Sequence, residues 1–150
     1  MRDRHQFQFD VDRAYAGQVV ATLETSPAHP LTDPQAPRSM GVYALYRRGS
    51  ESPVYIGEAV GASGTAGRLR DHLRKIQGRR GIGVDEMTCR FLIIERKWES
   101  ARAEDALIRH YSPERNGIPG FSMHLSGIGR PGKTRVHGLR RLCAGVNRAG

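Results

Sequence analysis

The chain has 150 residues, of which 38% are hydrophobic, and it carries 24 Lys and Arg against 15 Asp and Glu. This length predicts one domain with a single modest core. The apolar runs are far shorter than the roughly 20 residues that a membrane span requires, and no apolar stretch follows the charged N-terminus. We therefore expect neither a transmembrane helix nor a secretory signal. The net charge of +9 favours a polyanionic partner.

The positive charge is concentrated in two stretches. Residues 68–80 hold six basic side chains and one acid, and residues 128–150 hold six basic side chains and no acid. One such stretch could simply be a solvated face. Two in a small protein favour nucleic acid over a membrane, because no amphipathic anchor accompanies them.

The cysteine content indicates a reducing compartment. Cys89 and Cys143 form no CxxC or Cys/His cluster, so no structural zinc site is expected. We expect both to be reduced thiols in a cytoplasmic protein.

Residues 1–40 predict a helix followed by an extended strap. Asp10 is a suitable N-cap for a helix that runs to about Glu24. Four prolines between Ser26 and Met40 exclude a helix interior there. The helix and the strap are our candidates for contact with a second subunit.

Residues 41–57 predict a β-hairpin, because two runs rich in β-branched and aromatic residues flank a polar break at 47–53. Each run places a tyrosine two residues from a glycine. A glycine-bearing loop at 61–67 then leads into a helix that ends near Ile76. Arg68 and His72 lie four residues apart in it and share one face. Two phenols, a guanidinium and an imidazole can therefore converge on one side of a small sheet.

The remaining residues predict one strand and one helix. Residues 77–84 form a loop, 88–95 form the strongest strand, and a helix runs from about 99 to 111 with Ser100 as its cap. We assign Tyr46, Trp98 and Tyr111 to the core, and we expect weak order from residue 118 onward. The order α-β-β-α-β-α predicts the α/β (α+β) class, with a small three-stranded mixed or antiparallel sheet flanked by helices.

Several residues with the potential for catalysis occur in a particular order along the chain. They are Gly41-Val42-Tyr43, Tyr55-Ile56-Gly57, Arg68, His72, Glu104 and Asn116. Taken singly, each has an ordinary structural explanation, such as core packing or a surface charge. The ordered set resembles the GIY-YIG endonuclease superfamily, over about Gly41 to Asn116. The stretches VYIGEA, RLRDHLRKI and FLIIERKW are more particularly similar to small type II restriction endonucleases of that superfamily.

The resemblance implies a single domain over 1–150, with a catalytic core at 41–117 and a basic, glycine-rich segment at 118–150. It also implies Mg²⁺-dependent, sequence-specific cleavage of double-stranded DNA. Glu58 departs from the pattern, since the residue after YIG is often basic or small in this branch. An acid there could repel phosphate or help to hold a metal, and we assign it no role.

The resemblance also implies how the residues share the chemistry. Tyr43 would be the general base or would orient the water, although a free phenol has a pKa near 10 and needs help from a metal, Arg68 or His72. Tyr55 would hydrogen-bond the nucleophile or the phosphate. Arg68 would offer its planar fork to the scissile phosphate.

The metal site would depend on one carboxylate. Glu104 would hold a single Mg²⁺, for which Mn²⁺ could substitute, because no second carboxylate is placed to bind metal. Asn116 would orient the metal site or a backbone segment.

DNA contacts are expected from both basic stretches. The candidate residues are Arg70, Arg74, Lys75, Arg79, Arg80, Arg130, Lys133 and Arg135. Arg79, Arg80, Arg130 and Arg135 could read guanine edges in a GC-rich target, or they could contact phosphates only. A symmetric duplex site needs two active sites, so we expect a homodimer, formed alone or only on DNA.

Three other functions remain open. Asp85 with Glu95-Arg96-Lys97 superficially fits the acid and E-x-K pattern of another restriction-enzyme fold, but that pattern leaves both tyrosine tripeptides unexplained. A basic nucleic-acid-binding module without catalysis agrees equally well with the charge. Repair and homing nucleases share the GIY-YIG domain, although they usually carry further domains.

Overall fold

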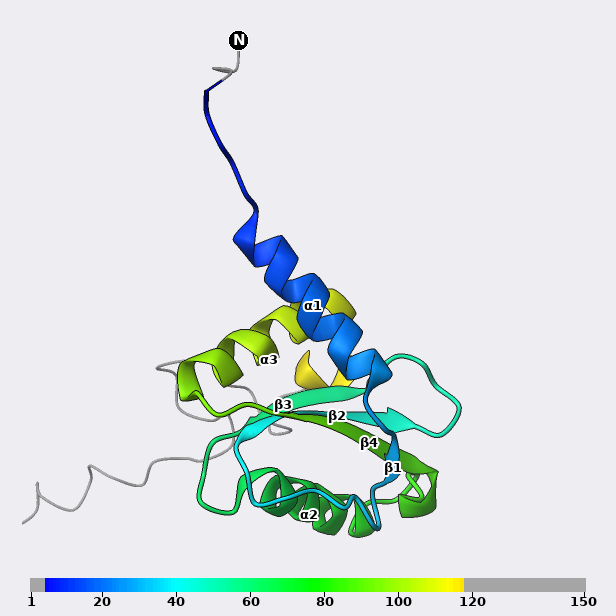
Figure 1. Cartoon of the computed structure of the whole chain (residues 1–150). Helices are drawn as coiled ribbons and strands as arrows, with labels where there is room; N and C mark the ends of the chain where they lie inside the picture. Colours follow the sequence, from blue (N-terminus) through cyan, green and yellow to red (C-terminus); the bar gives the residue numbers. More distant parts are fainter. Residues whose placement is uncertain (1–4, 118–150) are drawn as a thin grey trace, which may run out of the picture.

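The computed structural model describes residues 5–117. Three main helices and four strands follow one another along this part of the chain, together with two short 3-10 turns (Figure 1). Their bounds are α1 Val11–Thr25, β1 His29–Pro30, β2 Gly41–Arg47, β3 Tyr55–Ala59, α2 Gly64–Gln77, η1 Val84–Glu86, β4 Met87–Ile93, α3 Lys97–Tyr111 and η2 Glu114–Gly117. The segment 118–150, for which weak order was predicted, lies outside the described residues.

The strands form one antiparallel sheet in the order β1-β4-β2-β3. The three predicted strands are confirmed, and the strap adds the short strand β1 to the edge of β4. There His29 pairs with Cys89 and Pro30 with Thr88. A proline is tolerated at this position because an edge strand has one side without a ladder partner.

Helices cover both faces of the sheet, α2 on one face and α1 with α3 on the other (Figure 1). Alternate residues of the central strand β2 supply both cores, because successive side chains of a strand point to opposite faces. Tyr43 and Leu45 pack in the cluster under α2, whereas Val42, Ala44 and Tyr46 pack in the cluster under α1 and α3. Burial of β2 on both faces explains why its sequence is a continuous apolar run.

Two predictions at the start of α3 are wrong. The helix begins at Lys97, so Ser100 is not its cap but lies buried within it, where its hydroxyl donates to the Gly41 carbonyl at 3.1 Å. Trp98 falls in the first turn of α3 and is 60% exposed rather than part of the core. Tyr46 is buried as predicted, and Tyr111 is half-buried.

Residues 11–40 belong to the same folded body as the predicted core 41–117. Helix α1 packs against α3, and the strap contributes β1 to the sheet. Among the helices of residues 5–117, none is long and apolar enough to cross a membrane.

Candidate active site at the edge of the sheet

The pairing of β2 with β3 determines where the tyrosine and glycine of each hairpin strand meet. Tyr43 lies opposite Gly57, and Leu45 lies opposite Tyr55. A Cβ atom on Gly57 would lie 2.6 Å from the Tyr43 hydroxyl and 2.9 Å from Cε1 of Tyr55. The missing side chain at Gly57 therefore makes room for both rings, whose centroids are 6.1 Å apart.

His72 of α2 completes an aromatic cluster with these two tyrosines. Its ring centroid lies 5.4 Å from that of Tyr43 and 4.7 Å from that of Tyr55. Nε2 of His72 is 2.8 Å from the Tyr43 hydroxyl, in a buried hydrogen bond. The i, i+4 relation predicted between Arg68 and His72 places both on the face of α2 near the sheet.

Burial keeps both members of this hydrogen bond uncharged. It lowers the pKa of His72 to about 3, assisted by the positive charges of Lys75 and Arg68. It raises the pKa of Tyr43 well above its ordinary value of 10, and Tyr55 raises it further. At neutral pH the pair is therefore a phenol and a neutral imidazole, which can accept a proton at its unprotonated nitrogen.

Arg68 interacts electrostatically with the tyrosines, which lie on the α2 side of the sheet, and with Glu104 of α3, which covers the other side. Burial lowers its pKa, but interactions with Tyr43 and Tyr55 outweigh that effect, and the net shift is upward. The guanidinium also lowers the pKa of Glu104. Arg68 thus links the phenols electrostatically to the α3 carboxylate.

The acidic side of the site contains a second carboxylate. Burial raises the pKa of Glu104 to about 7, and the nearby charge of Glu58 raises it as well, while a hydrogen bond from the backbone N–H of Glu58 opposes the shift. Oε2 of Glu58 is buried without a hydrogen-bond partner. Sequence reasoning missed this pair, although the departure at position 58 was its signal.

A hard divalent cation fits this donor set. Carboxylate oxygens are ligands that Mg²⁺ prefers, and Mg²⁺ usually takes only one or two of them and keeps several waters. Within residues 5–117 no group of three or more His, Cys, Asp or Glu side chains could hold a metal. Glu104 and Glu58 could therefore supply part of a coordination shell, with the remainder left to water and substrate oxygens.

Asn116 holds the edge strand beside the tyrosines. Its Oδ1 accepts from the backbone N–H of Ile56 at 2.8 Å, and its Nδ2 donates to the Ile56 carbonyl at 2.7 Å. Ile56 stands between Tyr55 and Gly57. The side-chain amide therefore pairs with the strand edge as another strand would. The sequence analysis offered two partners for Asn116, the metal site or a backbone segment, and in the structure its amide bonds to a backbone segment.

The basic residues of α2 and of the loop after it lie on the surface. Arg70, Arg74, Lys75, Arg79 and Arg80 are all exposed. Arg74 makes only a long ion pair with Asp71, at 3.8 Å. The other three predicted DNA contacts, Arg130, Lys133 and Arg135, lie outside the described residues.

The rival acid and E-x-K pattern is not assembled. Asp85 lies in η1 before β4, and Glu95 follows the end of that strand. The seven residues of β4 separate the two acids by about 23 Å at about 3.3 Å per residue. They do not share a site.

An antiparallel sheet between two helical layers, with a tyrosine on each hairpin strand, defines the chain as a GIY-YIG nuclease domain, a class of DNA endonuclease. Residues 40–141 match the family model of the Eco29kI GIY-YIG domain. The chain belongs to this family, which is a restriction endonuclease family.

Solved structures similar to this chain include the GIY-YIG N-terminal endonuclease domain of UvrC from Thermotoga maritima. Its magnesium-bound form is 21% identical, with a TM-score of 0.37 over 71% of this chain and 97% of that one. A point mutant of the same domain, bound to its catalytic divalent cation, is 22% identical, with a TM-score of 0.39 over 71% and 97%. No curated protein sequence matches this chain.

Proposed function

We propose that this protein is a type II restriction endonuclease that cleaves double-stranded DNA at a specific sequence, with Mg²⁺ as its cofactor. The observation that carries the proposal is the hydrogen bond of 2.8 Å between the Tyr43 hydroxyl and Nε2 of His72, beside Arg68. A buried phenol with a proton acceptor on one side and a guanidinium on the other suits phosphodiester hydrolysis. It has no evident purpose in a module that only binds.

Tyr43 would act as the general base through a relay of protons. Its pKa is raised, so the phenol is protonated at neutral pH and cannot accept a proton unless it gives one up. The neutral imidazole of His72 can take that proton as Tyr43 removes one from the attacking water. The negative charge of bound phosphate would raise the proton affinity of His72 and assist the transfer.

The other side chains would bind and neutralise the phosphate. Arg68 would place its two parallel N–H groups on the phosphoryl oxygens, and Tyr55 would hydrogen-bond the phosphate or the nucleophile. Glu104 would hold Mg²⁺, which when bound supplies Lewis-acid stabilisation of the leaving oxygen. Asn116 would keep the β3 backbone, and with it Tyr55, in register.

DNA would be bound in the cytoplasm through the exposed basic residues of α2 and the following loop. Arg79 and Arg80 would contact either guanine edges or phosphates. The double variant Arg79→Ala, Arg80→Ala decides between these roles. Uniformly weaker binding to all duplexes, with a salt slope lower by about 0.9 for each lost contact, identifies phosphate contacts, whereas relaxed sequence preference identifies base readout.

Plasmid cleavage in Mg²⁺ and in EDTA tests the proposed function. We expect the wild-type protein to cut only with Mg²⁺, and Tyr43→Phe and Glu104→Ala to lower the rate by at least about 10²-fold. Glu95→Ala is the control and should retain activity, because Glu95 is exposed and belongs to the rival pattern that the fold does not assemble.

The same assay separates the alternatives. Retarded DNA that is never nicked would favour a binding module, and a Tyr43→Phe protein that cuts at the wild-type rate would remove the tyrosine from the mechanism. Run-off sequencing of the product ends shows whether cuts recur at one sequence. Cuts that follow damage rather than sequence would favour a repair nuclease.

A further inference from the structure

Glu58 has an environment that a carboxylate would not ordinarily occupy. Tyr55 and Ala59 of β3 pack in the cluster under α2, and Ile56 packs under α3. By strand alternation Glu58 shares the α3 side with Ile56. Its Oε2 atom is buried there and has no hydrogen-bond partner. A buried carboxylate oxygen is costly unless an ion or a donor satisfies it.

The residue that Glu58 meets is another acid. Glu104 of α3 accepts a hydrogen bond from the backbone N–H of Glu58, and the two carboxylates repel each other. Arg68 favours the charged form of Glu104 but also interacts with both tyrosines, and it does not outweigh burial and Glu58. Asp105, which pairs with Arg109 at 3.0 Å, adds to the repulsion. Two neighbouring acids with an unsatisfied buried oxygen have the chemistry of a cation site.

We propose that Glu58 is a second carboxylate ligand of the catalytic cation, so that one divalent metal ion is held between Glu58 and Glu104. The inference rests on the proposed function, because it adds a ligand to the Mg²⁺ site and does not create a separate one. Two carboxylates and several waters or phosphate oxygens are the usual shell of Mg²⁺. The acid that departs from the family pattern would thus strengthen the metal site rather than repel the phosphate.

Binding of Mn²⁺ to the full-length protein, followed by the loss of its free-ion electron paramagnetic resonance signal, tests the proposal without DNA. Replacing an outer partner of a metal ligand weakens affinity by roughly 10- to 100-fold, so Glu58→Gln should weaken Mn²⁺ binding by at least roughly 10-fold. Glu104→Gln should weaken it also. Glu95→Gln makes the same chemical change at an exposed site and should bind as the wild type does.

Thermal unfolding with and without Mn²⁺ provides a second readout. In EDTA, Glu58→Gln should melt at a higher temperature than the wild type, because the repulsion is gone, yet gain less on addition of Mn²⁺. If Glu58→Gln is too unstable to titrate, Glu58→Asp decides. Intermediate affinity would support the proposal, and wild-type affinity would overturn it.

The outcomes distinguish this inference from the proposed function. A wild-type protein that cuts DNA, with Glu58→Gln binding Mn²⁺ as tightly as wild type and Glu104→Gln failing to bind, overturns the role of Glu58 and leaves the nuclease standing. A wild-type protein that neither binds Mn²⁺ nor cuts DNA overturns both.

Discussion

Gly57 matters for the side chain that it lacks. It stands opposite Tyr43 in the sheet, and an added Cβ would lie 2.6 Å from the Tyr43 hydroxyl and 2.8 Å from Cζ. Atoms that close cannot coexist, so the ring of Tyr43 would have to leave the position from which it meets His72. The glycine that follows the tyrosine in YIG is thus a requirement of the phenol on the neighbouring strand.

Gly57→Ala should therefore destabilise the fold and impair cleavage together. We expect a loss of about 1–3 kcal/mol in the free energy of unfolding, from overpacking. A shift of about 1 Å in Tyr43 would lower the rate by roughly 10²-fold. Urea unfolding and plasmid cleavage measure the two effects. Gly17→Ala in α1 is the matched control, since nothing lies within 4 Å of its added Cβ, and it should stabilise by about 0.5–1 kcal/mol. Equal behaviour of the two variants would refute the steric argument.

Two buried groups of the site titrate in opposite senses. The folded-state pKa of His72 is lowered from 6.5 to about 3, so the unfolded chain binds its proton first and this group makes stability fall as the pH drops below 6.5. The folded-state pKa of Glu104 is raised from 4.5 to about 7, so its contribution to stability is lost as the pH rises from 4.5 to 7. Between pH 4.5 and 6.5 the two effects oppose each other.

Glu104→Gln in EDTA should expose the histidine alone. Relative to wild type, its stability should rise with pH by about 1.4 kcal/mol per unit across that window, which is the slope of one proton. Urea unfolding at several pH values from 4.5 to 6.5 measures the difference. Parallel curves for the two proteins would mean that Glu104 does not hold its proton in the fold.

Some site residues could be placed from the sequence and others could not. Tyr43, Tyr55 and His72 come together because strand pairing and the four-residue spacing of a helix are local rules. The proximity of Glu58 to Glu104 depends on how α3 packs against β3, which no local pattern encodes. Trp98 was misplaced for a related reason, since the helix starts two residues before its expected position and leaves the indole exposed in the first turn.

At the scale of the elements, β3 is an edge strand of the sheet and carries Tyr55, Gly57 and Glu58 of the candidate site. Its outward backbone groups at Ile56 have no strand partner, and the amide of Asn116 bonds to both of them. A third bond, from the N–H of Arg115 to the carbonyl of Val54 at 3.0 Å, fixes η2 against the residue before that strand. The Asn116 side chain thus satisfies the outward backbone groups of β3 between Tyr55 and Gly57.

Asn116→Ala should leave the Ile56 groups unpaired, at a cost of about 1–3 kcal/mol in the free energy of unfolding. The cleavage rate should fall because Tyr55 and Gly57 flank the freed residue. Asn116→Asp can still accept from the Ile56 N–H but cannot donate to its carbonyl, so we expect an intermediate loss in both urea unfolding and plasmid cleavage. Full activity in the alanine variant would limit Asn116 to a turn residue.

The short strand β1 shows the limit of prediction for whole elements. The prolines correctly exclude a helix in the strap, and an extended chain follows from them. Its attachment to β4 depends on the burial of Leu31 in the cluster under α2 and on the bond from the N–H of Leu31 to the Met87 carbonyl at 3.0 Å. These contacts join residues far apart in the sequence.

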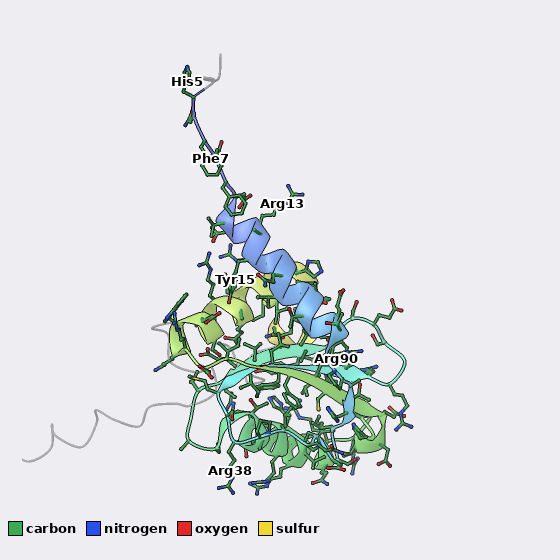
Figure 2. All side chains as sticks on the ribbon, viewed as in Figure 1. His5, Phe7, Arg13, Tyr15, Arg38 and Arg90 are labelled. Atoms are coloured by element: carbon green, nitrogen blue, oxygen red, sulfur yellow. The ribbon has the colours of Figure 1, made fainter. Side chains whose placement is uncertain are left out.

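For the whole molecule, the proposed cleavage of double-stranded DNA raises the question of how one active site could cut two strands. Helices cover both faces of the sheet, so neither face is open to a second copy of the chain. The segment that leads into α1 extends away from the body, with Phe7 on it, as Figure 2 shows. Phe7 is 88% exposed, Phe9 62% and Val11 54%. Exposed apolar side chains gathered in one place are typical of a contact surface.

We expect this N-terminal segment to join two copies on DNA, since a symmetric site requires two active sites related by a twofold axis. The double variant Phe7→Ser, Phe9→Ser should still nick supercoiled plasmid, because its active site is untouched, but should release open circles where the wild type yields linear DNA. Sedimentation with duplex DNA in EDTA should show one bound copy in place of two. Trp98→Ser is the control, as Trp98 is 60% exposed at the start of α3. If Trp98→Ser stops double-strand cutting and the phenylalanine variant does not, the two copies meet at α3 and the N-terminal segment serves another purpose.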